Sequence, residues 1–133
     1  MPASDFQGAL RALRGGGVDF VVVGGIAAVL NGAPVNTFDL DIVHARDPEN
    51  VAKLVLALSA MDAIYRIPLE VLGTIGRGLT YEYLLPHTTE MEIGAGVRVK
   101  VLDLKTIIIL KEELGGEKDL AVLPVLRRTL QQS

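Results

Sequence analysis

Helix and strand patterns are interleaved along the chain, which predicts an α/β fold. Apolar residues recur at helical spacing near the start, at Phe6, Leu10 and Leu13. Short apolar runs that end at glycine follow, and the clearest is Phe20–Val23, which is typical of a buried strand. The chain has 133 residues, and 50% of them are hydrophobic. This suits one domain with a sizeable core, so we expect a single domain over residues 1–133.

Capping residues and helix breakers mark the ends of several helices. Ser4 with Gln7 matches a capping box, Asp47 precedes Pro48, and Asp103 is placed to cap a later helix. The first expected elements, in order, are a helix from 4 to the glycines at 15–17, a strand 18–23, a helix 25–31, a strand 37–43 and a helix from 48. After these come a brief strand 64–67 interrupted by Pro68, a candidate strand 69–72, a loop 73–78 and a short helix 80–85. The chain then has a hairpin of 89–93 and 97–102, a helix 104–114, and a helix 118–130 interrupted at Pro124.

Two aspartates lie in the second expected strand. Because successive strand residues point to opposite faces, Asp39 and Asp41 project to the same side. Neighbouring carboxylates repel each other, and the commonest reason for such a pair is a hard divalent cation. Mg²⁺ prefers oxygen ligands and fills its remaining positions with water and substrate phosphates. The pair therefore predicts a site for Mg²⁺ or Mn²⁺.

Gly24 and Gly25 come directly after the first expected strand. Without side chains, the backbone N–H groups of such a turn can approach an anion, and the helix that follows offers its positive N-terminus. A metal site on one segment and an anion site on the other together predict a site for a nucleoside triphosphate.

The spacing of these two features matches a known signature. Gly24-Gly25, thirteen intervening residues and then Asp39-Leu40-Asp41-Ile42 resemble the signature of the polymerase-beta-like nucleotidyltransferase superfamily. The similarity is strongest to its small bacterial members, the minimal nucleotidyltransferases and abortive-infection toxin-type proteins. It implies the nucleotidyltransferase fold, which is a small mixed β-sheet flanked by helices.

The resemblance also implies an activity and partners. The activity is metal-dependent transfer of a nucleoside monophosphate from a nucleoside triphosphate to a hydroxyl acceptor, which would be a protein, an RNA end or a small molecule. Relatives often act as toxins paired with an antitoxin, which makes an antitoxin protein a candidate partner.

A third carboxylate is implied beside Asp39 and Asp41, and two glutamates are candidates for it. Glu70 and Glu92 each lie between two apolar residues. We expect Glu70 to take the role, as a metal ligand or a general base, with Glu92 as the alternative. Relative to the family, the chain looks shortened between residues 66 and 68, either by a natural deletion or by omission of a mobile stretch.

The resemblance assigns the phosphate contacts to two places in the chain. Gly24 and Gly25 would hold the β- and γ-phosphates, and Thr37 would orient the loop before the first acid. Relatives also have a lysine near Lys111, followed by a Gly-Arg-x-Lys-Asp motif that corresponds here to residues 115–119. Its lysine, Lys118, is expected near the phosphates. The alternative is that Lys118 belongs only to the start of a helix, where the helix dipole favours the neighbouring acid, Asp119.

The chain also departs from the family at several points. Val35 stands where many relatives have an arginine, and Gly116 stands where the later motif has one. Glu70 replaces the usual aspartate, and the middle segment looks shortened. These departures favour a second hypothesis, in which the protein is a catalytically degraded binding or regulatory module of the same fold.

Composition and charge argue against other classes. The net charge is −3 and no dense basic run is present, which argues against gripping a nucleic-acid backbone as the main function. The sequence has no cysteine, so disulfides, thiolate metal sites and cysteine nucleophiles are excluded.

The start of the chain has no signal-peptide pattern and no apolar run long enough for a bilayer, so we expect a cytoplasmic protein outside the membrane. An uncovered sheet edge in the shortened middle would favour a homodimer.

Overall fold

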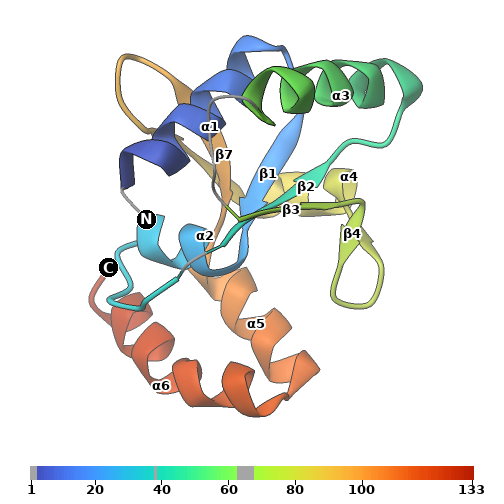
Figure 1. Ribbon diagram of the computed structural model, residues 1–133. Coiled ribbons are helices and arrows are strands. Elements are labelled where there is room, and N and C mark those ends of the chain that lie inside the picture. Colours follow the sequence, from blue (N-terminus) through green and yellow to red (C-terminus); the bar gives the residue numbers. More distant parts are fainter. Residues whose placement is uncertain (1–2, 38, 63–67) are drawn as a thin grey trace.

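The computed structural model describes residues 3–37, 39–62 and 68–133 (Figure 1). Within these ranges the elements, in order, are α1 (Ala3–Gly15), β1 (Phe20–Val23), α2 (Gly24–Leu30), β2 (Leu40–His44), α3 (Pro48–Asp62), β3 (Leu69–Leu72), β4 (Thr74–Ile75), β5 (Leu79–Thr80), α4 (Tyr81–Leu84), a 3-10 turn (Leu85–His87), β6 (Thr88–Glu92), β7 (Arg98–Leu102), α5 (Leu104–Leu114) and α6 (Glu117–Gln131). The helix already includes Ser4, but its side chain, for which a cap was predicted, and the strand predicted at 64–67 lie outside what the structure describes.

A five-stranded sheet forms the centre of the molecule, with strand order β3-β2-β1-β7-β6. β1 runs parallel to β7 and antiparallel to β2, while β3 is parallel to β2 and β6 is antiparallel to β7. The sheet is therefore mixed. The predicted α/β fold, a small mixed sheet flanked by helices, is confirmed.

The core centres on β1, the middle strand. All four residues of Phe20–Val23 are buried, as expected for a strand covered on both faces. The predicted caps of α5 are also present. The Asp103 carboxylate accepts a hydrogen bond from the Thr106 backbone N–H at 2.8 Å, and Gly115 ends the helix in the left-handed region at φ +63°.

Two groups of helices cover the sheet (Figure 1). α1 and α3 pack against each other, and the pair formed by α5 and α6 lies well apart from them. α2 and α5 begin at the same end of the sheet, because each directly follows one of the parallel strands β1 and β7. Asn31, at the C-terminal end of α2, links this helix to the end of β7, since its side-chain Nδ2 donates to the carbonyls of Ala27 at 2.8 Å and Leu102 at 3.0 Å.

The segment 73–78, which was expected to be a loop, is instead part of a small hairpin. β4 and β5 pair in a separate two-stranded sheet. Gly76 and Gly78 make the turn between them at φ +57° and +83°, which residues with side chains rarely adopt. Strands of two residues are too short to produce a recognisable alternating pattern, which explains the wrong prediction.

Two other boundaries differ from the expectation. β2 begins at Leu40, so Asp39 lies directly before the strand and not within it. α6 continues through Pro124 as one helix, so the proline does not end it. Among the described helices, none has both the length and the apolarity needed to cross a bilayer.

Candidate functional site

Three neighbouring strands bring the predicted residues together at one end of the sheet. Antiparallel pairing places Asp41 of β2 opposite Val23, the last residue of β1, so Asp41 lies beside the turn that begins at Gly24. Parallel pairing with β3 places Glu70 directly opposite Asp41 on the other side. The register therefore joins the glycine turn, one aspartate and one glutamate, although they lie far apart in the sequence.

Both glycines of the turn are in tight contact with the acidic segment. Gly24 has φ +69°, and a Cβ atom there would lie 3.3 Å from the carboxyl carbon of Asp41 and closer still to its Oδ2. A Cβ atom on Gly25 would lie 2.7 Å from the Cβ of Thr37. Neither position has room for a side chain, so the glycines allow the turn to pack directly on Asp41 and Thr37.

Thr37 lies in the loop between this turn and β2. Its hydroxyl donates to the backbone carbonyl of Asp39 at 3.4 Å. This long hydrogen bond and the contact with Gly25 connect the glycine turn to the first aspartate. The geometry is consistent with the loop-orienting role predicted for Thr37.

Asp41 is half-buried, and one of its carboxylate oxygens is not compensated. Its Oδ1 is buried and has no hydrogen-bond partner among the residues that the structure describes. Burial is the largest cause that raises the pKa of Asp41 from 3.8 to about 6, and the charge of Glu70 is the next. Asp39 raises this pKa as well, while Lys111 lowers it. An ionised carboxylate in such a setting is unfavourable unless a cation binds beside it.

Asp39 and Glu70 are both exposed, on either side of the half-buried Asp41. Their charges reach Asp41, as its raised pKa indicates. Nevertheless, within 3–37, 39–62 and 68–133 no three acidic or histidine side chains are already close enough together to hold a metal ion. The three carboxylates are thus neighbours that would have to turn toward a shared ion.

The alternative third carboxylate, Glu92, lies elsewhere. It is on β6, which is the edge strand opposite to β3, and it pairs with Arg98 at the start of β7. The Asp41 end of the sheet is instead the end at which β7 finishes, because β7 is parallel to β1. Glu92 is therefore separated from Asp41 both across the sheet and along it, whereas Glu70 is adjacent.

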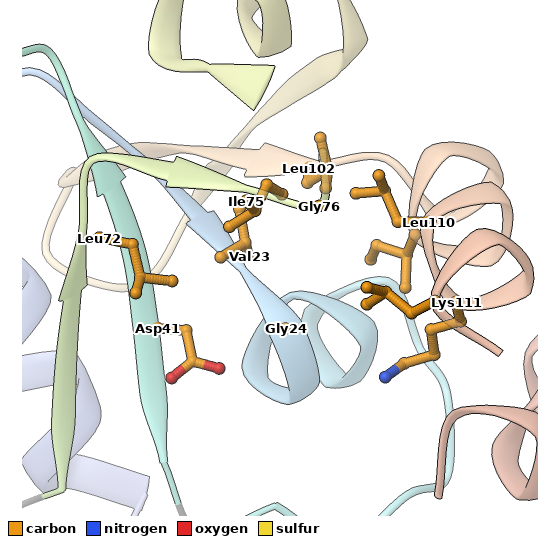
Figure 2. A pocket seen from close by; sticks show the side chains of 11 residues that line it. Val23, Gly24, Asp41, Leu72, Ile75, Gly76, Leu102, Leu110 and Lys111 are labelled. Atoms are coloured by element: carbon orange, nitrogen blue, oxygen red, sulfur yellow. The ribbon is translucent and has the colours of Figure 1, made fainter. Parts of the chain in front are cut away.

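A cavity of about 130 Å³ opens beside this end of the sheet. Figure 2 shows Asp41 and Lys111 on opposite sides of it, with the start of α2 at Gly24 between them. Their charged ends point toward the same open side. Lys111 comes from α5, so one helix supplies a positive charge to a site whose other charged groups are acidic.

The structure thus brings in a lysine that the sequence did not assign to the site. Lys111 is half-buried, and its Nζ lies 3.2 Å from Oδ1 of Asp119 on α6. Lys118, the predicted phosphate contact, is exposed in the first turn of α6. The sequence indicated Lys111 only because relatives carry a lysine near this position. Helical spacing alone did not show toward which side of α5 the Lys111 side chain points.

No protein-family model and no curated protein matches the chain. The features that bear on its function are therefore the orphaned oxygen of Asp41, the glycine turn against it, Glu70 beside it and Lys111 across from it.

Proposed function

We propose that the protein is a metal-dependent nucleotidyltransferase, which moves a nucleoside monophosphate from a nucleoside triphosphate to a hydroxyl acceptor. The observation that carries the proposal is the Asp41 carboxylate. It is half-buried, one of its oxygens has no partner among the described residues, and it lies between a glycine turn and a second carboxylate. Buried polar atoms without partners and perturbed pKa values are concentrated at functional sites.

The donor atoms at this site fit Mg²⁺ or Mn²⁺. Asp39, Asp41 and Glu70 offer only carboxylate oxygens, which are the ligands these hard cations prefer. The orphaned Oδ1 of Asp41 is the atom that a cation would satisfy first. When bound, such an ion neutralises charge on the triphosphate and stabilises the in-line displacement.

The other residues have roles that follow from their positions. Gly24 and Gly25 would offer their backbone N–H groups to phosphate oxygens, while the room left by their missing side chains is taken by Asp41 and Thr37. Lys111 supplies a positive charge across from the carboxylates. Glu70 either completes the metal ligands or accepts the proton of the attacking hydroxyl. Lys118 stays a predicted phosphate contact at the start of α6.

A second candidate is a nucleotide-binding or regulatory module that has lost catalysis. The observation that favours it is the separation of the carboxylates, which do not form a ready three-ligand group within the described residues. The absence of arginines at Val35 and Gly116 points the same way.

Titration calorimetry with a nucleoside triphosphate, with and without Mg²⁺, tests whether the site is competent. We expect binding that depends on Mg²⁺ and is abolished by Asp39→Ala and by Asp41→Ala. Transfer of label from an α-³²P-labelled nucleotide to components of a cell extract would then identify the acceptor. Binding that ignores Mg²⁺, with no transfer, would favour the second candidate, and no binding would contradict both.

The partners belong to the same proposal. The described part of β3 lies at an edge of the sheet, so pairing of β3 with a second copy would give a homodimer. An antitoxin protein is a further proposal that rests on the resemblance, and a cytoplasmic location stays the expectation drawn from the sequence. A single monomeric mass in light scattering at high concentration would contradict the homodimer.

A further inference from the structure

The cavity beside Asp41 has two chemically different parts. Asp41 and Lys111 are the only charged side chains among the described residues that line it, and both lie at its open side (Figure 2). The remaining side chains of the lining are aliphatic, and they come from the sheet, the β4–β5 hairpin and α5. A ligand that fills both parts therefore needs charged groups at the opening and apolar surface further in, as a metal-bound nucleotide has in its phosphates and in the faces of its base.

The aliphatic part is narrow because two elements close over it. Gly76 of the hairpin packs against Leu110 of α5 and closes one side of the cavity, and Ile75 lines it next to them. A Cβ atom on Gly76 would lie 3.1 Å from Cδ2 of Leu110, so the hairpin approaches the helix as closely as a glycine allows. On the sheet side, Val23 and Leu72 complete the wall.

The volume is that of a single six-membered ring. Apolar protein cavities of about 150 Å³ that are lined by leucine, isoleucine and phenylalanine bind one benzene molecule. At about 130 Å³ the whole cavity, with its charged part included, is no larger than this, so its aliphatic part has room for one such ring at most. A pyrimidine has one ring of this kind, whereas a purine would have to leave its second ring outside or displace the hairpin.

The lining also predicts how a base is read. No aliphatic side chain can donate or accept a hydrogen bond, so a base edge buried against them would lose its partners at a cost. The polar edge must stay toward the opening, and only the faces of the ring contact the walls. Such a site selects a base by size and does not distinguish cytosine from uracil.

We infer that the aliphatic cavity holds the base of the nucleotide and that the protein prefers pyrimidine over purine nucleoside triphosphates. This inference rests on the proposed nucleotide site and adds the class of substrate. Ile75 and Leu110 are the specificity-determining residues, because they set the width of the cavity.

Titration calorimetry of the full chain in Mg²⁺ with CTP, UTP, ATP, GTP and inorganic tripolyphosphate tests it. We expect CTP and UTP to bind within about threefold of each other and at least about tenfold more tightly than the purine nucleotides. Both should also bind more tightly than tripolyphosphate, which has no base. Equal or tighter binding of purines, or pyrimidine nucleotides no tighter than tripolyphosphate, would overturn the inference while leaving the phosphate and metal site intact. Failure of tripolyphosphate and all four nucleotides to bind would overturn the proposed function as well.

Widening the cavity provides a second test. Ile75→Ala should raise the affinity for ATP relative to CTP by about tenfold, since the second ring of the purine then has space. Leu110→Ala should act in the same direction, but Leu110 is 8% exposed and its loss disturbs the core, so the half-buried Ile75 is the primary variant. Ile109→Ala is the matched control, because Ile109 lies on the same helix, is 43% exposed and does not line this cavity. An unchanged ratio in Ile75→Ala and Leu110→Ala, or the same change in Ile109→Ala, would contradict the assignment.

Discussion

The two outer strand pairs of the sheet hold their acidic residues in opposite ways. In the β6–β7 pair, each acid lies opposite a base, as Glu90 lies opposite Lys100. In the β2–β3 pair, Asp41 lies opposite Glu70, an acid against an acid. Opposite charges across a strand pair stabilise a sheet, whereas like charges directly opposite destabilise it. The acids of β6 are therefore placed to stabilise the sheet, while those of β2 and β3 destabilise it, and the cation proposed above would offset that cost.

Neutralising each of the two candidate carboxylates, Glu70 and Glu92, tests this contrast most strongly. If Glu70 is part of the active site, Glu70→Gln should lower nucleotidyl transfer by about 100-fold, because a metal ligand or the acceptor of the hydroxyl proton is lost. Glu92→Gln should leave transfer unchanged. The rate of label transfer under single-turnover conditions measures both, and a larger loss in Glu92→Gln would reverse the assignment.

The close contact between the glycine turn and Asp41 gives the next largest effect. Gly24→Ala should destabilise the fold by about 1–3 kcal/mol and abolish nucleotide binding, because the backbone has positive φ and the new Cβ collides with Asp41. Gly32→Ala is the control, since Gly32 has φ +96° but no atom within 4 Å of a Cβ there. Urea unfolding of both variants separates backbone strain from the contact, and equal losses would show that the contact is unimportant.

The pH dependence of stability distinguishes the acid–acid pair from the acid–base pairs. The folded-state pKa of Asp41 is raised, so its proton stabilises the fold below about pH 4, and this contribution is lost as pH rises through about 6. After allowance for partial exposure, we expect a change of about 1–2 kcal/mol. Asp41→Asn should remove that part of the slope, and Mg²⁺ should restore stability to the wild type above pH 6. Thermal unfolding across pH 4–7 measures it, and identical profiles for both proteins would exclude the effect.

Two lysines, Lys111 and Lys118, are candidates for the proposed phosphate contact. Lys111→Met should weaken binding of a nucleoside triphosphate by about tenfold, because a charge-assisted hydrogen bond is lost at the cavity. Lys118→Met, at the exposed start of α6, should change it by less than twofold if Lys111 is the main contact. Calorimetric titration of both variants decides between them, and the opposite order would support the assignment made from sequence.

The smallest effect is expected at the acid–base pairs themselves. Arg98 Nε lies 3.5 Å from Glu90 Oε2, and both side chains are more than half exposed. Arg98→Met should therefore cost less than about 1 kcal/mol and leave nucleotide binding unchanged. A loss of several kcal/mol in urea unfolding would mean that the β6–β7 pair is more important to the fold than its exposure indicates.

The elements that the sequence predicted well are those with strong local signals. The four apolar residues of β1, the aspartate cap of α5 and the glycine after it specify structure through neighbours in the chain. The β4–β5 hairpin was missed because two-residue strands leave no periodic pattern. Segment 73–78 therefore looked like a loop.

The sequence predicted which types of residue form the site, but it did not determine which of them lie opposite each other in the sheet. Alternation put Asp39 and Asp41 on one side, yet only the long-range register shows that Glu70, and not Glu92, lies opposite Asp41. Likewise, the sequence indicated that the glycines leave room for an anion, whereas the structure shows that their bare backbone also packs on the acidic segment. Which lysine faces the cavity depends on how α5 rests on the sheet, and no local pattern carries that information.

The amide of Asn31 has a mechanical consequence. By bonding the end of α2 and the end of β7 at once, it ties the backbone that carries Gly24 to the backbone that leads into the helix of Lys111. The glycine turn at the start of α2 and the lysine-bearing helix α5 are therefore linked through one set of hydrogen bonds, and a ligand that contacts both does not have to restrain two independent segments. Such a frame is preorganised, so less conformational entropy is lost when the bridge forms.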